Sequence, residues 1–531
     1  MAPVEINTPP SSLPTAIVVS HLAAVGYILF VAGRSIYRSY IALPPSSSTR
    51  HREPLRKGHV QTFSILALVS LAFAGYYASR FGSLSYRVWA TERGVELPDG
   101  LFGGKGALRG GEHPGRLHVV RWLSDTPFYR DALEIICEKA RHFWWGQQIS
   151  LGLISWSMYL AVEGHRRNIS NLWAFLALSQ LVSLSFAQNL FFIAVLLTPV
   201  PLPKNVRELT RTSVPATSSR YTQFLKSVVP TKPEGFIPNP KLYLLLLSSN
   251  FLAVLLLPAA ANTTSFMATA FTSRLLPFSF LALPYVVPES WGTIHRLPHD
   301  SYVTYSKIFQ TISALSAVLH LKSTFLALFY NTPDSTYYRH SLLHPFKEEH
   351  RSTFDRSTIA LGRVFGAMGE HPAVSAVGWD VLLSGLSLGI WAAIRGLEAN
   401  DMLTSSIPFM KLAAKEAEDS TLALKEDVEP ENDKIDPGNT RRRPGRPKKH
   451  EEPDTVAPKR RGRSAKKAIE LTNGVDEDDA NYEPTESEKS EEGDEDVEED
   501  WEIGALAWGL LSVGGLGVGS AGVLGAEVVG R

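Results

Sequence analysis

Carboxylic acids stand inside or directly beside stretches of the chain that are otherwise apolar. Asp380 lies in the run VSAVGWDVLLSGLSLGIWAAIRG, which carries no other charge before its final arginine. Glu163 ends an apolar run, and Glu289 follows another in the segment YVVPESWGTIH. Burial penalises the charged form of a carboxyl group, and a carboxyl that keeps its proton can serve as a general acid. These three residues are therefore candidate catalytic residues for proton transfer.

Aromatic and amide side chains accompany these carboxyls. Trp379, Trp291 and Trp156 each lie close in sequence to one of them. Aromatic faces attract cations, so such rings are suited to holding a carbocation that forms after protonation. Asn189 stands within a further apolar run, where polar groups are functional candidates by default. We assign these four residues as candidate substrate-binding residues.

The carboxyls could also have purely structural roles. Glu163 is followed by Arg166 and Arg167, which is typical of a charged helix end. Asp380 paired with Lys322, from a neighbouring apolar run, would hold two helices in register. Both roles predict buried ion pairs in place of a reactive acid.

Motifs for metal or cofactor chemistry are absent from the sequence. It contains no His-Glu-x-x-His pattern, no Gly-x-Ser-x-Gly elbow, and no clustered His and carboxylate at helical spacing. The single cysteine, Cys137, excludes an intrachain disulfide and a cysteine-ligated zinc cluster. We therefore expect neither a metal nor a cofactor.

The elements that position these residues follow from the distribution of apolar residues. The chain has 531 residues, with 53 Lys and Arg against 53 Asp and Glu and a formal net charge of zero. Balanced charge argues against a globally basic nucleic-acid-binding protein.

Hydrophobic residues make up 44% of the chain. They gather in blocks of about 20, the length at which a helix crosses a bilayer. This segregation predicts an all-α, polytopic transmembrane helical bundle.

Roughly eight or nine spans are predicted, in two parts of the chain. A polytopic membrane domain over 1–397 carries all but the last of them. Its spans lie near 15–32, 60–79, 144–162, 172–197, 242–260, 265–287, 308–330 and 374–394. A Gly-rich C-terminal transmembrane helix occupies 503–531. Small residues such as Gly517 and Ala521 recur there at four-residue spacing, which predicts close packing against the bundle.

A further helix is predicted just before the span 144–162. The segment SDTPFYRDALEIICEKARHFWW places Leu133, Ile136 and Cys137 on one face and Asp131 and Glu134 on the other. The aromatic residues that follow are typical of a membrane interface. We expect an interfacial helix; alternatively, its carboxylates form one wall of a site at the membrane surface.

The segment 398–502 is charged and poor in aromatic residues, which predicts disorder. Its basic half, 441–467, contains RRRPGRPKKH and PKRRGRSAKK. These runs resemble the AT-hook, a short Arg-Gly-Arg-Pro module that binds the minor groove of DNA. An anionic-lipid patch, or pairing with the acidic run that follows, would have the same composition. The candidate nucleic-acid-binding residues are Arg443, Gly445, Arg446, Arg461 and Arg463.

Longer stretches of the chain resemble a group of fungal integral-membrane proteins. They include RWxxDTPxYRDALEIxxEKARHFWWxQQ, EGHRRxIxxLWAFxALSQLVxLSFAQNLF, GWDxxLSGLSLGxWA and the final GGLGVGSAGVLGAE. In these runs the chain is similar to the membrane-bound terpene cyclases of the ascochlorin type, which act in fungal meroterpenoid biosynthesis. The resemblance covers 121–395 and 503–527 and leaves out the charged segment.

The resemblance implies a metal-independent isomerase or lyase that cyclises a prenyl or epoxyprenyl chain. It also implies residence in the endoplasmic reticulum or a related endomembrane, with the bilayer and a prenylated small molecule as partners. The matching runs do not identify which residue of this chain would correspond to a catalytic residue of that family. On chemical grounds Asp380 is expected to be the acid, and Glu163 or Glu289 the base.

A non-enzymatic function is the alternative. In this reading the chain is a multi-pass membrane protein whose basic segment tethers DNA or anionic lipid. A transporter is less favoured, because the sequence shows neither an internal repeat nor a pair of interrupted helices.

Overall fold

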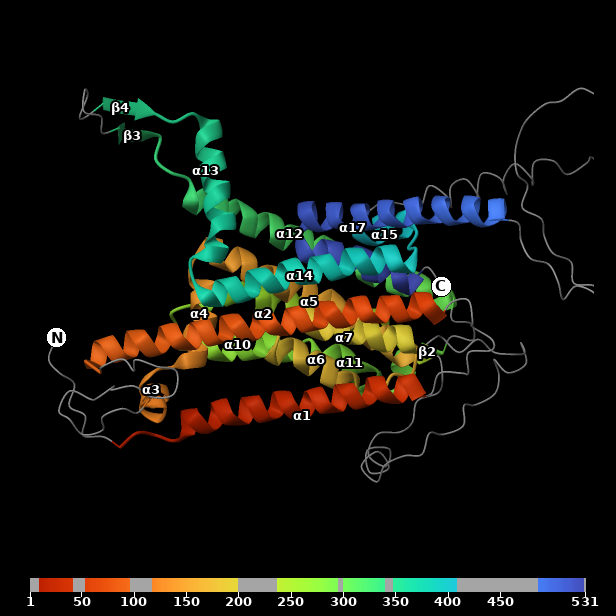
Figure 1. Ribbon diagram of the computed structural model, residues 1–531, viewed down its shortest axis with the longest axis horizontal. Helices are drawn as coiled ribbons and strands as arrows, with labels where there is room; N and C mark the ends of the chain where they lie inside the picture. The colour runs from red at the N-terminus through yellow and green to blue at the C-terminus, as the bar shows by residue number, and fades with distance from the viewer. Residues whose placement is uncertain are drawn as a thin grey trace, which may run out of the picture. The chain divides into compact units, whose positions relative to one another are not determined.

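The computed structural model of the chain is almost entirely helical, as Figure 1 shows. It describes residues 9–41, 53–95, 117–198, 236–294, 299–339, 347–407 and 486–529. The strands in these residues form two short antiparallel pairs. In one, β1 (Phe236–Pro238) pairs with β2 (Gly292–Ile294); in the other, β3 (Thr336–Arg339) pairs with β4 (Lys347–His350).

The helices follow one another along the chain with short connections in several places. The first group is α1 (Leu13–Ile41), α2 (Glu53–Arg93), α3 (Val119–Asp125), α4 (Phe128–Glu138), α5 (Ala140–Arg166), α6 (Leu172–Leu181) and α7 (Leu184–Leu197). The second is α9 (Pro240–Ala260), α10 (Phe266–Leu275), α11 (Phe278–Val286), η4 (Glu289–Trp291) and α12 (His299–Asn331). The third is α13 (Thr353–Gly366), η5 (Ala367–Gly369), α14 (Pro372–Arg395), α15 (Ala399–Ser406) and α17 (Glu486–Val529).

Six of the described helices are long and apolar enough to cross a bilayer. They are α1, the Arg56–Arg93 part of α2, α9, the Thr304–Asn331 part of α12, α14, and the Trp501–Val529 part of α17. Helices α10 and α11 pass the same test together but are bent by 57°, so they form at most one broken span. The described residues thus have the architecture of a helical membrane protein. They hold six or seven such segments, fewer than the sequence predicted.

Two predicted spans fail the test for different physical reasons. The span 144–162 corresponds to α5, which carries buried polar residues such as Gln147 and Gln148. Its neighbours, chiefly α12, α14 and α4, cover most of its side chains, so contact with lipid does not require them to be apolar. The span 172–197 is divided near Ser183 into α6 and α7, and each piece alone is short.

Aromatic packing joins α2, α7 and α14. Trp391 of α14 stacks on Phe192 of α7 with ring centroids 4.2 Å apart. Phe63 of α2 meets both rings edge-on, and all three side chains are fully buried. Such pairs contribute about 0.5–1.5 kcal/mol each beyond the area they bury. These contacts fix the helix that carries Asp380 against two neighbours.

Interrupted helices are present in the bundle, although they were not evident from the sequence. In α17 the backbone of Gly515 adopts a φ of 74°, which breaks the helix. The N–H of Leu516 then donates to Oε1 of Gln148 at 2.8 Å, and the Gln148 amide is hydrogen-bonded to His320 Nδ1 at 2.7 Å. A second interruption separates α6 from α7. Two breaks do not by themselves make the matched pair of interrupted helices that a transporter with internal repeats has, so the prediction against a transporter stays a prediction.

The C-terminal half of α17 packs inside the bundle. Every residue from 515 to 528 is buried. At Gly517 an added Cβ would lie 2.7 Å from Cβ of Leu151 in α5 and 2.8 Å from Cβ of Ser316 in α12. Backbones approach this closely only where side chains are small. The predicted close packing of the last span is confirmed.

The segment 398–502 is described only at its two ends. Its first residues form α15, in which Met402, Ser405 and Ser406 are buried, so the packed domain continues past 397. At the other end α17 begins at Glu486, ahead of the predicted start at 503. The remainder, 408–485, lies outside the described residues. So do the AT-hook-like positions Arg443, Gly445, Arg446, Arg461 and Arg463, and their binding to DNA or lipid stays a prediction.

Substitution of Gly517 by alanine tests the close contact of α17. We expect G517A to lower the thermal unfolding midpoint in detergent, because overpacking at such a site costs about 1–3 kcal/mol. The matched control is Gly509→Ala in the same helix, where an added Cβ meets nothing within 4 Å. G509A should unfold at or above the wild-type midpoint, because Ala favours a helix over Gly. Equal midpoints for the two variants would contradict the packing.

Candidate functional site

A cavity of about 360 Å³ lies within the bundle. Residues of α1, α2, α4, α5, α9, α10 and α14 line it, together with the junction between α6 and α7. Aromatic rings contribute much of the wall: they are Phe73, Tyr77, Phe81, Phe128, Tyr129 and Phe143. An apolar cavity with a few polar groups is the usual form of a small-molecule site.

The helix predicted before the span 144–162 supplies one wall. This helix is α4, which begins at Phe128. A separate short helix, α3, precedes it and ends at Asp125. Leu133, Ile136 and Cys137, which the sequence placed on one face, all line the cavity. The amphipathic helix is confirmed. Its apolar face, not its carboxylate face, belongs to the site.

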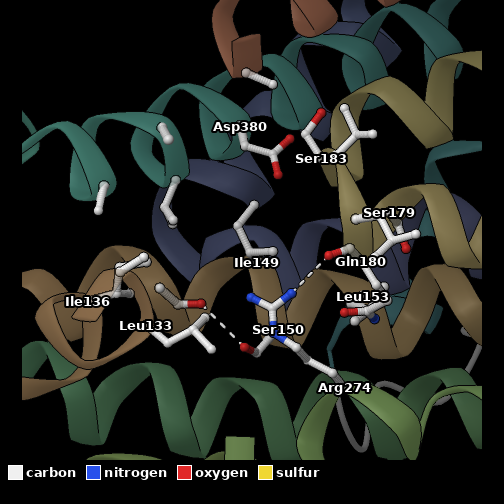
Figure 2. A pocket seen from close by; sticks show the side chains of 18 of the residues that line it. Leu133, Ile136, Ile149, Ser150, Leu153, Ser179, Gln180, Ser183, Arg274 and Asp380 are labelled. Carbon is white, nitrogen blue, oxygen red and sulfur yellow. Dashed lines mark hydrogen bonds between the residues drawn. The ribbon is translucent and has the colours of Figure 1, made fainter. Parts of the chain in front are cut away.

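Asp380 is the one carboxylic acid among the described residues that line this cavity. It is 9% exposed. Its Oδ2 accepts a hydrogen bond from the N–H of Leu184 at 2.9 Å, and its Oδ1 accepts one from the N–H of Ser185 at 2.8 Å. These residues open α7, so the carboxyl of α14 caps the start of that helix. Figure 2 shows Asp380 beside Ser183, at the junction of α6 and α7.

The contact has two physical consequences. The first N–H groups of a helix have no partner within it, and anions are stabilised at this end. Asp380 therefore satisfies two buried donors that the interruption after α6 leaves open. Each carboxyl oxygen accepts one N–H bond and keeps a second acceptor site, so Asp380 can carry a proton while it caps α7. The structure pairs Asp380 with backbone N–H groups, whereas the sequence offered Lys322 as a partner.

Polar groups also stand on the opposite side of the cavity, where Figure 2 shows Arg274 pointing inward from α10. Arg274 Nη1 donates to the backbone carbonyl of Gln180 at 3.0 Å. The side-chain Nε2 of Gln180 is buried and has no hydrogen-bond partner among the described residues. Arg274 lies within the predicted span 265–287 and was not among the candidate site residues. Its position within an apolar run was the signal that could have identified it.

The predicted aromatic residues lie in different places. Trp379 stands behind the cavity wall: its Nε1 donates to the Tyr77 hydroxyl at 2.9 Å, and its ring lies 4.5 Å from that of Phe73. Trp156 is buried in the core against Phe191, away from the lining residues. Trp291 is 59% exposed in η4.

The other predicted polar residues do not line the cavity either. Glu289 is exposed in the same η4 turn as Trp291. Asn189 is fully buried, and its Nδ2 donates to the carbonyl of Ser185 at 2.8 Å. It thus packs within the first turns of α7. Of the predicted catalytic and binding residues, the structure brings only Asp380 to the cavity wall, with Trp379 behind it.

Glu163 belongs to a separate buried charge cluster. It accepts from Arg166 at 2.6 Å and from Arg167 at 2.8 Å, which confirms the predicted helix-end group. Glu527 of α17 joins the cluster through Arg395 of α14 at 2.9 Å and lies 3.8 Å from Arg167. The cluster ties α5, α14 and α17 together. The sequence did not identify its last two members, because they are far apart along the chain.

A second, larger cavity of about 660 Å³ adjoins the first. Cys137, Phe143 and Val254 line both. Lys139 and Lys322 contribute positive charge to the second cavity alone. A single layer of side chains therefore separates the two spaces.

Comparison of the chain with protein-family models, with curated proteins and with solved structures finds no match. The geometry of the cavity is therefore the basis for interpreting the site.

Substitutions at Asp380 test its capping role. Asp380→Ala leaves two buried N–H groups without an acceptor, at a cost of about 1–3 kcal/mol each. We expect the unfolding midpoint in detergent to fall most for D380A and less for D380N, which keeps one acceptor. Asp131→Asn on α4 is the control and should unfold like the wild type. A D380A midpoint equal to that of the control would contradict the cap.

Labelling of Cys137 tests the enclosure of the cavity. The thiol is 4% exposed. Burial raises the pKa of Cys137 to about 12, although the nearby Arg274 guanidinium works in the opposite direction. The thiol therefore stays protonated at neutral pH, and only the thiolate reacts readily. We expect a polar maleimide to leave the folded protein unmodified by mass and to label it fully in SDS. Complete labelling of the folded protein would mean that the cavity is open to water.

Proposed function

We propose that the chain is a membrane enzyme that cyclises a prenyl or epoxyprenyl chain bound in the aromatic-lined cavity. The observation that carries the proposal is the position of Asp380, a buried carboxyl on the wall of an apolar cavity with several aromatic rings.

Asp380 is assigned as the general acid. Its carboxyl proton passes to the epoxide oxygen or to an alkene carbon, and the C–O bond opens or a carbocation forms. Internal double bonds then attack the cation and close the rings. The Asp380 carboxylate left behind is held by the N–H groups of Leu184 and Ser185. It takes back the proton lost by the final cation, so substrate and product are isomers.

The cavity rings would stabilise the cation during ring closure. Phe73, Phe81 and Phe128 line the space, and their faces attract positive charge without reacting with it. Trp379 supports Phe73 and Tyr77 from behind. Glu163 and Glu289 do not line the cavity, so neither is needed as the base in this route.

The finer membrane arrangement is part of the same proposal. We place α5 and the α6–α7 pair within the depth of the bilayer, which brings the count of spans to about eight or nine. Their polar residues are covered by neighbouring helices, as a bilayer requires. We assign the protein to the endoplasmic reticulum or a related endomembrane, where a lipophilic prenyl substrate would be dissolved.

A microsomal assay tests the proposed reaction. Yeast microsomes containing the chain are supplied with a farnesyl-aryl compound and its terminal epoxide, and products are analysed by mass spectrometry. We expect a product of unchanged mass and altered retention. D380N should reduce its rate by about a hundredfold or more, in line with the removal of a general acid.

The matched control is Glu163→Gln, which alters a buried carboxyl away from the cavity. E163Q should retain cyclisation in proportion to the folded protein that size-exclusion chromatography recovers. Undiminished product from folded D380N would exclude Asp380 as the acid. Absence of product with every prenyl chain, from wild-type protein that is folded and membrane-bound, would overturn the proposed activity.

A further inference from the structure

Arg274 places a cation against an otherwise largely apolar cavity. Its guanidinium carries several N–H donors, and its one hydrogen bond among the described residues goes to the carbonyl of Gln180. No carboxylate in the described part of the chain lies within ion-pair distance of Arg274. A cation that is withdrawn from water without a counter-charge is costly. A fixed guanidinium with spare donors is therefore suited to an anion from outside the chain.

Gln180 independently indicates that a hydrogen-bond acceptor is missing from this part of the cavity, within the ranges that the structure describes. Its Nε2 is buried in the cavity region without a hydrogen-bond acceptor among the described residues. Leaving such a donor unpaired costs about 1–3 kcal/mol, which an acceptor on a ligand would relieve. Gln180 and Arg274 are neighbours, because the guanidinium contacts the Gln180 backbone. Both residues therefore belong to the same region of the wall.

Asp380 does not serve as the counter-charge. Its two oxygens are held by the N–H groups at the start of α7. Figure 2 shows it entering from α14, on the other side of the cavity from Arg274. In Figure 2 the apolar side chain of Ile149 lies between the two polar groups. The cavity therefore has a cationic end, an apolar middle and an acidic end.

We infer that Arg274 and Gln180 bind the oxyanion head group of an amphiphile whose apolar chain lies in the cavity. Carboxylate, phosphate and phenolate heads share the required chemistry: negative oxygens that accept charge-assisted bonds from a guanidinium and a bond from an amide N–H. The inference rests on the proposed function only in that it names the head group of the substrate. The inference concerns ligand binding alone. A binding measurement can therefore contradict it without contradicting the proposed cyclisation, and the reverse is also true.

Binding to the purified full-length chain in neutral-lipid nanodiscs tests this inference. The probes are farnesoic acid, farnesyl phosphate and the uncharged farnesol, with affinity measured by quenching of intrinsic fluorescence. We expect both anions to bind at least about tenfold more tightly than farnesol, a difference of about 1.4 kcal/mol. Equal affinity for farnesol and the anions would overturn the inference.

Variants of Arg274 and Gln180 test whether these residues cause the preference for anions over farnesol. Arg274→Gln should reduce the anion preference to near unity while farnesol binds as before, and Arg274→Lys should retain part of it. Gln180→Glu should disfavour the anions by like charge. Arg87→Gln changes an exposed arginine of α2 outside the cavity and should behave as the wild type. Full anion preference in folded R274Q would overturn the assignment.

Two further arms identify the source of the head group. Inorganic phosphate is added as a competitor, and anionic phosphatidylglycerol is introduced into the nanodisc. Competition by phosphatidylglycerol would support the site and identify a bilayer lipid as its occupant, and its absence would support a free amphiphile. Inorganic phosphate binding as tightly as farnesyl phosphate would show that the apolar chain contributes nothing, which overturns the amphiphile.

Discussion

The structure depends on the need to pair every backbone polar group that an apolar bundle removes from water. Continuous helices meet this need by themselves, whereas the interruptions before α7 and at Gly515 of α17 leave backbone groups that need partners elsewhere. At the start of α7 the N–H groups that have no acceptor within the helix bond to Asp380. Beyond Gly515 the N–H of Leu516 bonds to Gln148. Each interruption is thus completed by a polar side chain from another helix. The helices that contribute them, α14 and α5, are accordingly fixed in register.

The cap that Asp380 forms is compatible with the proposed role of this residue as an acid. As a cap it orders the junction of α6 and α7, and as a group on the cavity wall it faces the space where a ligand would lie. A carboxylate produced by proton donation would remain between the same N–H donors, so the surroundings need not rearrange. Preorganised donors of this kind are an important source of stabilisation in enzymes. The cap and the proposed acid therefore both require the Asp380 carboxyl to stay beside the N–H groups of Leu184 and Ser185.

Much of the architecture could be predicted from the sequence, because an apolar run of about 20 residues has the length that a helix needs to cross a bilayer. The close packing of α17, the amphipathic α4 and the cluster at Glu163 also followed from local patterns. Long-range pairings did not. Hydropathy alone cannot show that α5 is shielded by its neighbours, that α6 and α7 are separate, or that Trp156 faces the core. For the same reason, the importance of Arg274 emerged only when the cavity placed it opposite Asp380.

The thin partition between the two cavities bears on the length of chain that the site accepts. Cys137, Phe143 and Val254, from three different helices, line both spaces. A side chain can change rotamer far more readily than a packed helix can move. If a prenyl chain occupies the first cavity as proposed, the side chains of Cys137, Phe143 and Val254 set the limit on its length at this end.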